Sequence, residues 1–276
     1  SLTVSGAADL GANVTTTGTQ TYAGAVTLSG GARTLTGSSI NTQSTLAGGG
    51  NALTVTGAVD VDGAYTGLSS LSVSGASNIG ANVTTTGTQS YTGAMTVSAN
   101  SQLSGSSLSL GAVALESGGA GYTLTLSNSD ANSAITGIIS GAGALTKTGA
   151  GTLTLSGNNT YTGTSSVNAG TLKLGHVNAL GSDATGSGTT VGAGAALDLN
   201  NLTVSEPVSL AGGRVLNGAL AGPMALTADS TIAARRRALA LGAKDFVSKP
   251  FDVIEIALRI ANLLETRILY QRLRSA

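Results

Sequence analysis

The chain of 276 residues has no cysteine, one histidine, three prolines and only 9% charged residues. The lack of cysteine excludes disulfide bonds and thiol redox catalysis. Globular domains carry about 25% charged residues, so solubility here must come from the hydroxyls and amides of Thr, Ser and Asn. No stretch reaches the ~18 consecutive apolar residues of a membrane helix, and we expect no transmembrane segment.

Composition divides the chain at residue 232. The first 232 residues hold 40 of the 41 glycines and neither phenylalanine, with 4 basic and 9 acidic side chains, a net charge of −5. Residues 233–276 hold one glycine, both phenylalanines, and 9 basic against 4 acidic side chains, a net charge of +5. Low charge with abundant Gly and Ser is compatible with disorder, but the regular Leu, Val and Ile of the first segment supply apolar surface to bury. The two segments therefore indicate two different functions.

The first segment contains a long duplication. Residues 1–29 return as residues 70–98, so that Leu2 corresponds to Leu71 and Tyr22 to Tyr91, an offset of 69. Within each unit the apolar residues alternate with Thr and Ser over short runs that end at Gly, Asn or Ala. This alternation predicts short strands with one buried face.

A stack of coils explains these strands better than hairpins do. The turns lack the Asn-Gly and Asp-Gly pairs of tight hairpins, the side chains are small, and the repeat is linear along the chain. In the run 152–157, Leu153 and Leu155 are predicted to point inward, where each buried side chain contributes about 1.5–3 kcal/mol. At roughly 20–25 residues per coil, residues 1–232 predict about ten coils of a parallel β-solenoid.

Two sequence stretches resemble known repeats. VTTTGTQTYAGAVTLSGG (14–31) resembles the repeats of filamentous-haemagglutinin-type exoproteins. GALTKTGAGTLTLSGNNTYTGTSSVNAGTLKLG (143–175) closely resembles the autotransporter-associated β-strand repeat of bacterial passenger domains. The resemblance implies a right-handed parallel β-helix that is exported through the outer membrane, surface-exposed or secreted, and often adhesive. The outward rows of Thr and Ser offer a surface to a host glycan or protein. From the residues themselves we expect a non-enzymatic protein with no catalytic residue, metal, cofactor, small-molecule substrate or nucleic-acid partner.

The C-terminal residues 223–276 follow a different pattern, which predicts a strand, a helix, a strand and a long helix at 252–273. ALALGAKDFVSKPFD (238–252) resembles the end of a response-regulator receiver domain, whose parent is cytoplasmic. The resemblance places Thr227 at the switch hydroxyl, Lys249 at the phosphoryl-contacting lysine and Pro250 after a cis bond. Upstream there is only solenoid sequence, so we expect no phosphate-accepting Asp and no Mg²⁺ ligands.

The two patterns meet at about residues 226–234, in sequence acceptable to either parent. We therefore expect an artificial or degenerate fusion of a β-helix passenger fragment to an incomplete, non-phosphorylatable receiver fragment. The chain begins inside a repeat, without a leader, and we expect its N-terminus to be cut off. The membrane barrel of autotransporters, the secretion domain of haemagglutinins and the output domain of response regulators are absent from this sequence. Two alternatives stay open: a phosphorelay signalling protein, and a polysaccharide-cleaving β-helix.

Few residues suit catalysis or metal binding. A catalytic triad or a metal site would have to use His176, which lies in the turn-like sequence LKLGHVNALGS. Asp60 and Asp62 alternate within one strand and could share a face, as paired carboxylates or calcium ligands do. Calcium requires more oxygen ligands than this segment offers, so the turn interpretation is favoured for both.

Three other patterns have a structural interpretation. The glycine-rich runs 141–145 and 192–197 are predicted to be coil corners, because no helix follows that would bind a phosphate. The basic run 235–237 is predicted to be a solvated helix face, because no base-stacking aromatic residues adjoin it. Four asparagines stand in Asn-x-Thr sequences that accept glycans in a secretory route or occupy turns, and turns are favoured: Asn13, Asn82, Asn158 and Asn201.

Overall fold

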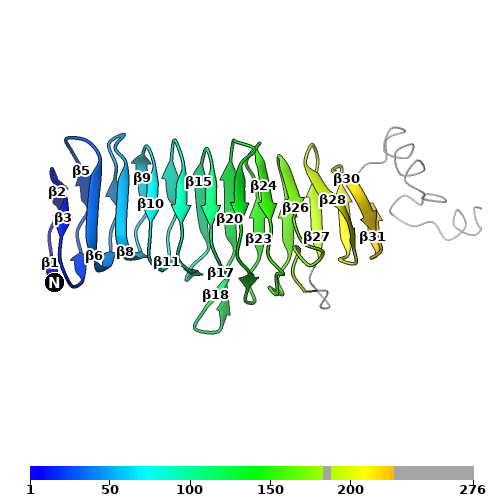
Figure 1. The fold of residues 1–276 in the computed structure, drawn as a ribbon, viewed down its shortest axis with the longest axis horizontal. Helices are drawn as coiled ribbons and strands as arrows, with labels where there is room; N and C mark the ends of the chain where they lie inside the picture. Colours follow the sequence, from blue (N-terminus) through cyan, green and yellow to red (C-terminus); the bar gives the residue numbers. More distant parts are fainter. Residues whose placement is uncertain (183–187, 227–276) are drawn as a thin grey trace, which may run out of the picture. The chain divides into compact units, whose positions relative to one another are not determined.

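The computed structural model describes residues 1–182 and 188–226 (Figure 1). Within these residues the secondary structure consists of strands β1 to β31, and no helix is present. Successive strands along each side pair in parallel, one coil to the next. The prediction of a mainly β, parallel solenoid is confirmed for this part of the chain. The right-handedness implied by the resemblance stays a prediction.

Each coil has three sides, which we name A, B and C in chain order. Side A is formed by β3 (Val14–Thr15), β10 (Leu71–Val73), β13 (Gln89–Tyr91), β16 (Leu108–Leu110), β21 (Ser133–Ile135), β24 (Thr152–Leu155), β26 (Thr171–Leu174) and the first halves of β6 (Arg33–Thr42), β8 (Leu53–Val61), β28 (Ala196–Val204) and β30 (Arg214–Leu220). Side B is formed by the second halves of these four long strands together with β1 (Leu2–Val4), β4 (Gln20–Tyr22), β11 (Ser77–Ile79), β14 (Met95–Val97), β17 (Val113–Ala114) and β22 (Ile139–Ser140).

Side C is a separate 12-stranded sheet in which every strand pairs with the next one in chain order. Its strands are β2 (Ala8–Leu10), β5 (Val26–Leu28), β7 (Leu46–Ala47), β9 (Tyr65–Leu68), β12 (Val83–Thr85), β15 (Ser101–Gly105), β20 (Leu124–Asn128), β23 (Leu145–Lys147), β25 (Ser165–Val167), β27 (Thr189–Gly192), β29 (Val208–Ala211) and β31 (Met224–Leu226). One strand per coil gives twelve coils, where the sequence predicted about ten.

The coils are shorter than expected because each side takes only six residues. Strands β10 to β14 begin at residues 71, 77, 83, 89 and 95, and Leu71 pairs with Gln89, eighteen residues further on. Longer coils contain an insertion. Val113 pairs with Ile139 because the antiparallel hairpin of β18 (Glu116–Ser117) and β19 (Ala120–Gly121) projects from that coil (Figure 1).

The core is a set of aliphatic ladders along the axis. On side C, Val26, Leu46 and Val83 are almost fully buried, and Tyr65 stacks between the last two. On side A, Leu153 and Leu155 are both fully buried, and the side chains between and before them are half-buried. The inward assignment made from the alternating pattern is therefore confirmed.

Close stacking of the coils requires glycine at the corners. A Cβ on Gly93 would lie 2.2 Å from the carbonyl oxygen of Gly75 in the preceding coil, and a Cβ on Gly75 would lie 2.4 Å from that of Gly57. Real Cβ atoms do not approach backbone so closely. The glycine abundance of the first segment is thus a consequence of coil stacking, in addition to the backbone freedom that glycine gives to turns.

The two halves of the duplication lie on different sides of the solenoid. Leu2 belongs to β1 on side B, where it pairs with Gln20, whereas Leu71 belongs to β10 on side A, where it pairs with Gln89. The offset of 69 residues therefore corresponds to three full coils and two further sides. A six-residue unit fits any side, so the same sequence folds in the same way when it starts two sides further on.

Candidate binding groove

Outward positions of the solenoid carry rows of hydroxyl groups. On side A, Thr34, Thr54, Ser72, Ser90 and Ser109 are cross-strand neighbours in five successive coils. Adjacent strands lie about 4.8 Å apart, so the hydroxyls repeat at that spacing. Because charged residues are few, these hydroxyl rows supply most of the polar surface of side A.

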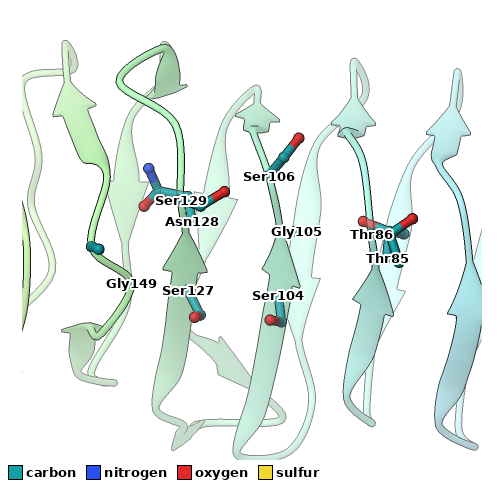
Figure 2. A pocket seen from close by; sticks show the side chains of 10 residues that line it. Thr85, Thr86, Ser104, Gly105, Ser106, Ser127, Asn128, Ser129 and Gly149 are labelled. Atoms are coloured by element: carbon teal, nitrogen blue, oxygen red, sulfur yellow. The ribbon is translucent and has the colours of Figure 1, made fainter.

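A groove runs along the corner where side C passes into side A. We call it the corner groove. It is open to solvent, has a volume of about 260 Å³ and crosses four coils (Figure 2). Its lining consists of Thr85, Thr86, Ser104, Gly105, Ser106, Ser127, Asn128, Ser129, Gly149 and Ala150. None of these residues is charged or aromatic.

Small residues and in-register strand ends form the groove. Thr84, Ser104 and Ser127 pair across β12, β15 and β20, so the chain leaves side C at the same height in each coil. A Cβ on Gly105 would lie 2.7 Å from both the Gly87 carbonyl oxygen and Thr85 Oγ1. The corner therefore stays narrow, with hydroxyl-bearing residues on either side of Gly105.

The groove is supported from below by Gln89, which is fully buried. Its Nε2 donates to the carbonyl oxygens of Val83, at 3.0 Å, and of Ser104, at 2.8 Å. The first belongs to its own coil and the second to the next coil. This amide thereby ties the carbonyls of two neighbouring coils together and fixes the backbone at Ser104.

Asn128 has the same role one coil further on. Its Nδ2 donates to the carbonyl oxygens of Asp130, at 2.7 Å, and of Thr152, at 2.9 Å, and the side chain is 1% exposed. Its Oδ1 is buried without a hydrogen-bond partner in the described structure. Asn128 thus connects the two neighbouring coils that carry Ser129 and Gly149 in the groove lining (Figure 2).

Lys147, at the end of β23, is the cation next to the groove. Its Nζ donates to the carbonyl oxygen of Gly149 and, at 3.4 Å, to that of Ala169. Burial lowers the pKa of this ammonium group to about 8, because desolvation disfavours the charged form. Lys147 supports the corner from inside and contributes no charge to the groove lining.

These features suit reversible binding of a neutral, hydroxyl-rich ligand. Hydroxyl groups both donate and accept hydrogen bonds, and the lining offers them in three successive coils, whereas the fourth coil contributes Gly149 and Ala150. The lining contains no acid, base or thiol that could act in catalysis. Across residues 1–182 and 188–226, no group of three or more His, Cys, Asp or Glu side chains could hold a metal ion.

Sequence reasoning missed this groove, although a signal was present. Small polar triplets end three successive side C strands: residues 84–86, 104–106 and 127–129. Without the coil register these triplets look like ordinary turn residues. Their alignment depends on a coil of 18 to 23 residues, which the sequence analysis did not resolve.

His176 occupies a turn, as expected. Its Nδ1 accepts a hydrogen bond from the backbone N–H of Asn178 at 3.0 Å, and its carbonyl oxygen accepts one from Ala179. The ring therefore stabilises its own turn.

Asp60 lies at an outward, half-buried position within β8 on side B, and Asp62 is exposed just after β8 ends at Val61. The turn interpretation is therefore wrong for Asp60, because its backbone pairs with the strands of both neighbouring coils. Asp60 Oδ1 accepts a hydrogen bond from Asn78 Nδ2 at 2.8 Å, so it is part of a cross-strand polar pair. The pKa of Asp62 is raised by burial and by the nearby charge of Asp60. The expectation that both share a face is confirmed.

The glycine-rich runs and the four asparagines of the Asn-x-Thr sequences lie at corners. Gly141 and Gly194 have φ values of 98° and 78° and start no helix. Asn13, before β3, and Asn82, before β12, each accept a backbone N–H from the next coil. Asn201 has a φ of 63° between the two halves of β28. The turn interpretation is confirmed for these positions.

The receiver-like residues Thr227, Lys249 and Pro250, the basic run 235–237 and the long helix predicted at 252–273 lie outside the described residues. Those predictions stay predictions. Among the residues that the structure does describe, no helix is long and apolar enough to cross a membrane.

Comparison with known proteins gives one match. The family described as the passenger-associated transport repeat matches residues 145–174, which run from β23 through β24 and β25 to the end of β26. No curated protein and no solved structure gives a significant match. The matched repeat, lying within a parallel β-solenoid, fits a β-helix of the autotransporter passenger type.

Proposed function

We propose that residues 1–226 are part of a surface-exposed or secreted, non-enzymatic β-helix that presents a binding surface, as an adhesin does. The passenger-associated transport repeat at residues 145–174 carries this proposal. Two features of the structure support it. The twelve-coil solenoid is an extended scaffold, and its outward rows and corner groove are rich in hydroxyls and poor in charge.

The proposed ligand is a host glycan that lies along the corner groove. Sugar hydroxyls match the hydroxyls of Thr86, Ser104, Ser106 and Ser129 in hydrogen-bonding capacity. The groove follows the solenoid axis, so a linear saccharide would meet a similar environment at each coil. Its openness favours exchange of the ligand over tight enclosure. A host protein is the other partner that the sequence suggested.

A glycan array probed with the full chain tests this proposal. Ser106→Tyr and Ser129→Tyr would fill the groove, so each variant should lose binding at least tenfold. Ser72→Tyr and Ser90→Tyr, on the side A row, are the matched controls and should bind like the parent. Binding that survives the groove variants but is lost in the controls would place the ligand on side A. No binding to any glycan would contradict the proposed ligand class.

A polysaccharide-cleaving enzyme is the first alternative. It requires two carboxyl groups about 5–9.5 Å apart across a bound sugar, and the lining of the corner groove contains none. Incubation with a panel of polysaccharides should release no reducing ends. Release that is lost on replacing Asp60 or Asp62 with Asn would establish this alternative.

Phosphorelay signalling is the second alternative. Residues 223–276 resemble only the end of a receiver, so we propose that the segment takes up no phosphoryl group, whether the fusion is natural or artificial. Acetyl phosphate with Mg²⁺ should leave the chain unlabelled. We expect the mass of the chain to be the same before and after this incubation. A phosphoryl-aspartate on any peptide would contradict that expectation.

A further inference from the structure

Four Asn-x-Thr sequences share one pattern of burial in the solenoid. In each of them the asparagine and the threonine are exposed, and the residue between them is buried or half-buried. The three-residue segments are 13–15, 82–84, 158–160 and 201–203. Side chains two residues apart in extended backbone lie on the same face, so the amides of Asn13, Asn82 and Asn158 point outward together with their threonine hydroxyls. Asn201 has a φ of 63° and shares only the exposure of its asparagine and threonine side chains.

The amide oxygen is engaged in three of these segments. Asn13 Oδ1 accepts a hydrogen bond from the N–H of Thr34 at 2.9 Å, and Asn82 Oδ1 accepts one from the N–H of Gln102 at 2.8 Å. Asn158 Oδ1 accepts one from Asn178 Nδ2 at 2.9 Å. Within the described part of the chain, the Nδ2 atoms of these three asparagines donate no hydrogen bond. The nitrogen, and not the oxygen, is the group left facing solvent.

We propose that Asn13, Asn82, Asn158 and Asn201 are acceptor sites for N-linked glycosylation. The donor is a nucleotide-activated sugar, and the catalyst is a separate transferase. A bond forms between Nδ2 and the anomeric carbon, and the bond from that carbon to the phosphate oxygen breaks. The nucleoside diphosphate leaves with the electron pair, and a base of the transferase takes one Nδ2 proton. The step involves no oxidation or reduction.

The corner contacts survive this modification. An N-linked amide keeps its carbonyl oxygen as an acceptor, so the bonds to Thr34, Gln102 and Asn178 remain. Asn13 and Asn82 stand just before β3 and β12, and Asn201 stands between the two halves of β28. A sugar at these corners projects away from the coils and leaves their ladder hydrogen bonds in place. It also adds hydrophilic surface to a chain with 9% charged residues.

Asn100 is a matched control within the chain. It is exposed, and its Oδ1 accepts a hydrogen bond from the N–H of Thr123 at 2.8 Å. Its contact thus equals those of Asn13 and Asn82, but Gln102 stands two residues on, where the acceptor sequence needs a hydroxyl. Gln102→Thr supplies that hydroxyl at an outward, half-buried position of β15.

The experiment is co-expression of the full chain with a soluble asparagine glycosyltransferase that uses UDP-glucose, followed by peptide mass mapping. We expect one hexose at each of the four asparagines, none at Asn100, and a new hexose at Asn100 in Gln102→Thr. Thr15→Ala and Thr84→Ala should each remove the hexose from their own site alone. The glycosylated chain should melt within a few degrees of the unmodified chain.

Three outcomes would overturn the proposal. The first is an absence of hexose at all four sites while an added acceptor peptide, in the same cells, is modified. The second is modification of Asn100 in the parent chain at the same level as the four sites. The third is a glycosylated chain whose far-ultraviolet circular dichroism no longer shows strand structure. Glycan-array binding is measured separately on the unmodified chain, so failure of one proposal leaves the other testable.

Discussion

The hydroxyl of Tyr91 donates a hydrogen bond to Oε1 of Gln89, two residues earlier on the same strand, at 3.0 Å. Both side chains are buried in an otherwise largely aliphatic core. The duplicate of this pair, Tyr22 and Gln20, makes the same bond at 2.9 Å on another side of the solenoid. Since Gln20 Nε2 also donates to carbonyl oxygens of two coils, the pair is a repeated device that ties a corner to the core.

Replacement of this glutamine should destabilise the solenoid. In Gln89→Leu the carbonyl oxygens of Val83 and Ser104 and the hydroxyl of Tyr91 lose their partner. Each buried polar group left unsatisfied costs about 1–3 kcal/mol, and we expect a loss of about 3 kcal/mol in urea unfolding. Gln102→Leu, at an outward position, should change the unfolding free energy by less than about 0.5 kcal/mol. Equal midpoints for the two variants would contradict the proposed role of Gln89.

The role of Gln89 is a feature that could not be predicted from the sequence. The alternation of Leu153 and Leu155 with threonine predicted parallel coils, because a period of two and small residues leave few other ways to bury one face. The same alternation places Gln89 on the inward face, yet a glutamine there contradicts the rule that inward residues are apolar. Its acceptors are carbonyls six and fifteen residues away, and only the coil register brings both near the amide. The corner groove was missed for the same reason, since its lining comes from four coils.

Gly93 at the corner between sides A and B gives a graded test of coil stacking. A Cβ would lie 2.2 Å from the nearest backbone oxygen at Gly93 and 3.2 Å at Gly111, and would meet nothing within 4 Å at Gly6. None of the three has a positive φ, so the added methyl group is the variable. Gly93→Ala should lose about 1–3 kcal/mol through overpacking, and Gly111→Ala should lose less. Gly6→Ala should gain up to about 1 kcal/mol from the unfolded chain. Gly6 lies between β1 on side B and β2 on side C, so it is a reference outside this corner. Thermal unfolding of the three variants in any other order would contradict coil contact at Gly93.

Lys147 should make stability depend on pH. Its folded pKa of about 8 lies below the ordinary value of 10.5, so the unfolded chain binds more protons between these values. Stability therefore rises with pH in this window, by about 1 kcal/mol per pH unit. Burial also raises the pKa values of Tyr65, Tyr91 and Tyr161, and this reduces stability above pH 10. Urea unfolding is thus best measured between pH 7 and 9.5.

Two variants test whether Lys147 causes this pH dependence of stability. Lys147→Met retains the length of the side chain without an ionisable group, and its unfolding free energy should no longer rise between pH 8 and 9.5. Lys173→Met removes a lysine that points outward on side A, and its rise should equal that of the parent. A rise that persists in Lys147→Met would show that another group titrates in this window.

Leu155 tests the inward ladder of side A directly. It is fully buried between Ile135 of the preceding coil and Leu174 of the next. Leu155→Asp places an unpaired carboxylate where water cannot hydrate it, which costs several kcal/mol. Because coils are stabilised mainly by their neighbours, we expect the loss to spread to both adjacent coils. Thr154→Asp is the control on the outward face and should cost less than about 1 kcal/mol. Hydrogen exchange should accelerate at residues 135 and 174 in Leu155→Asp alone, and a melting temperature equal to that of the parent would show that position 155 is not inward.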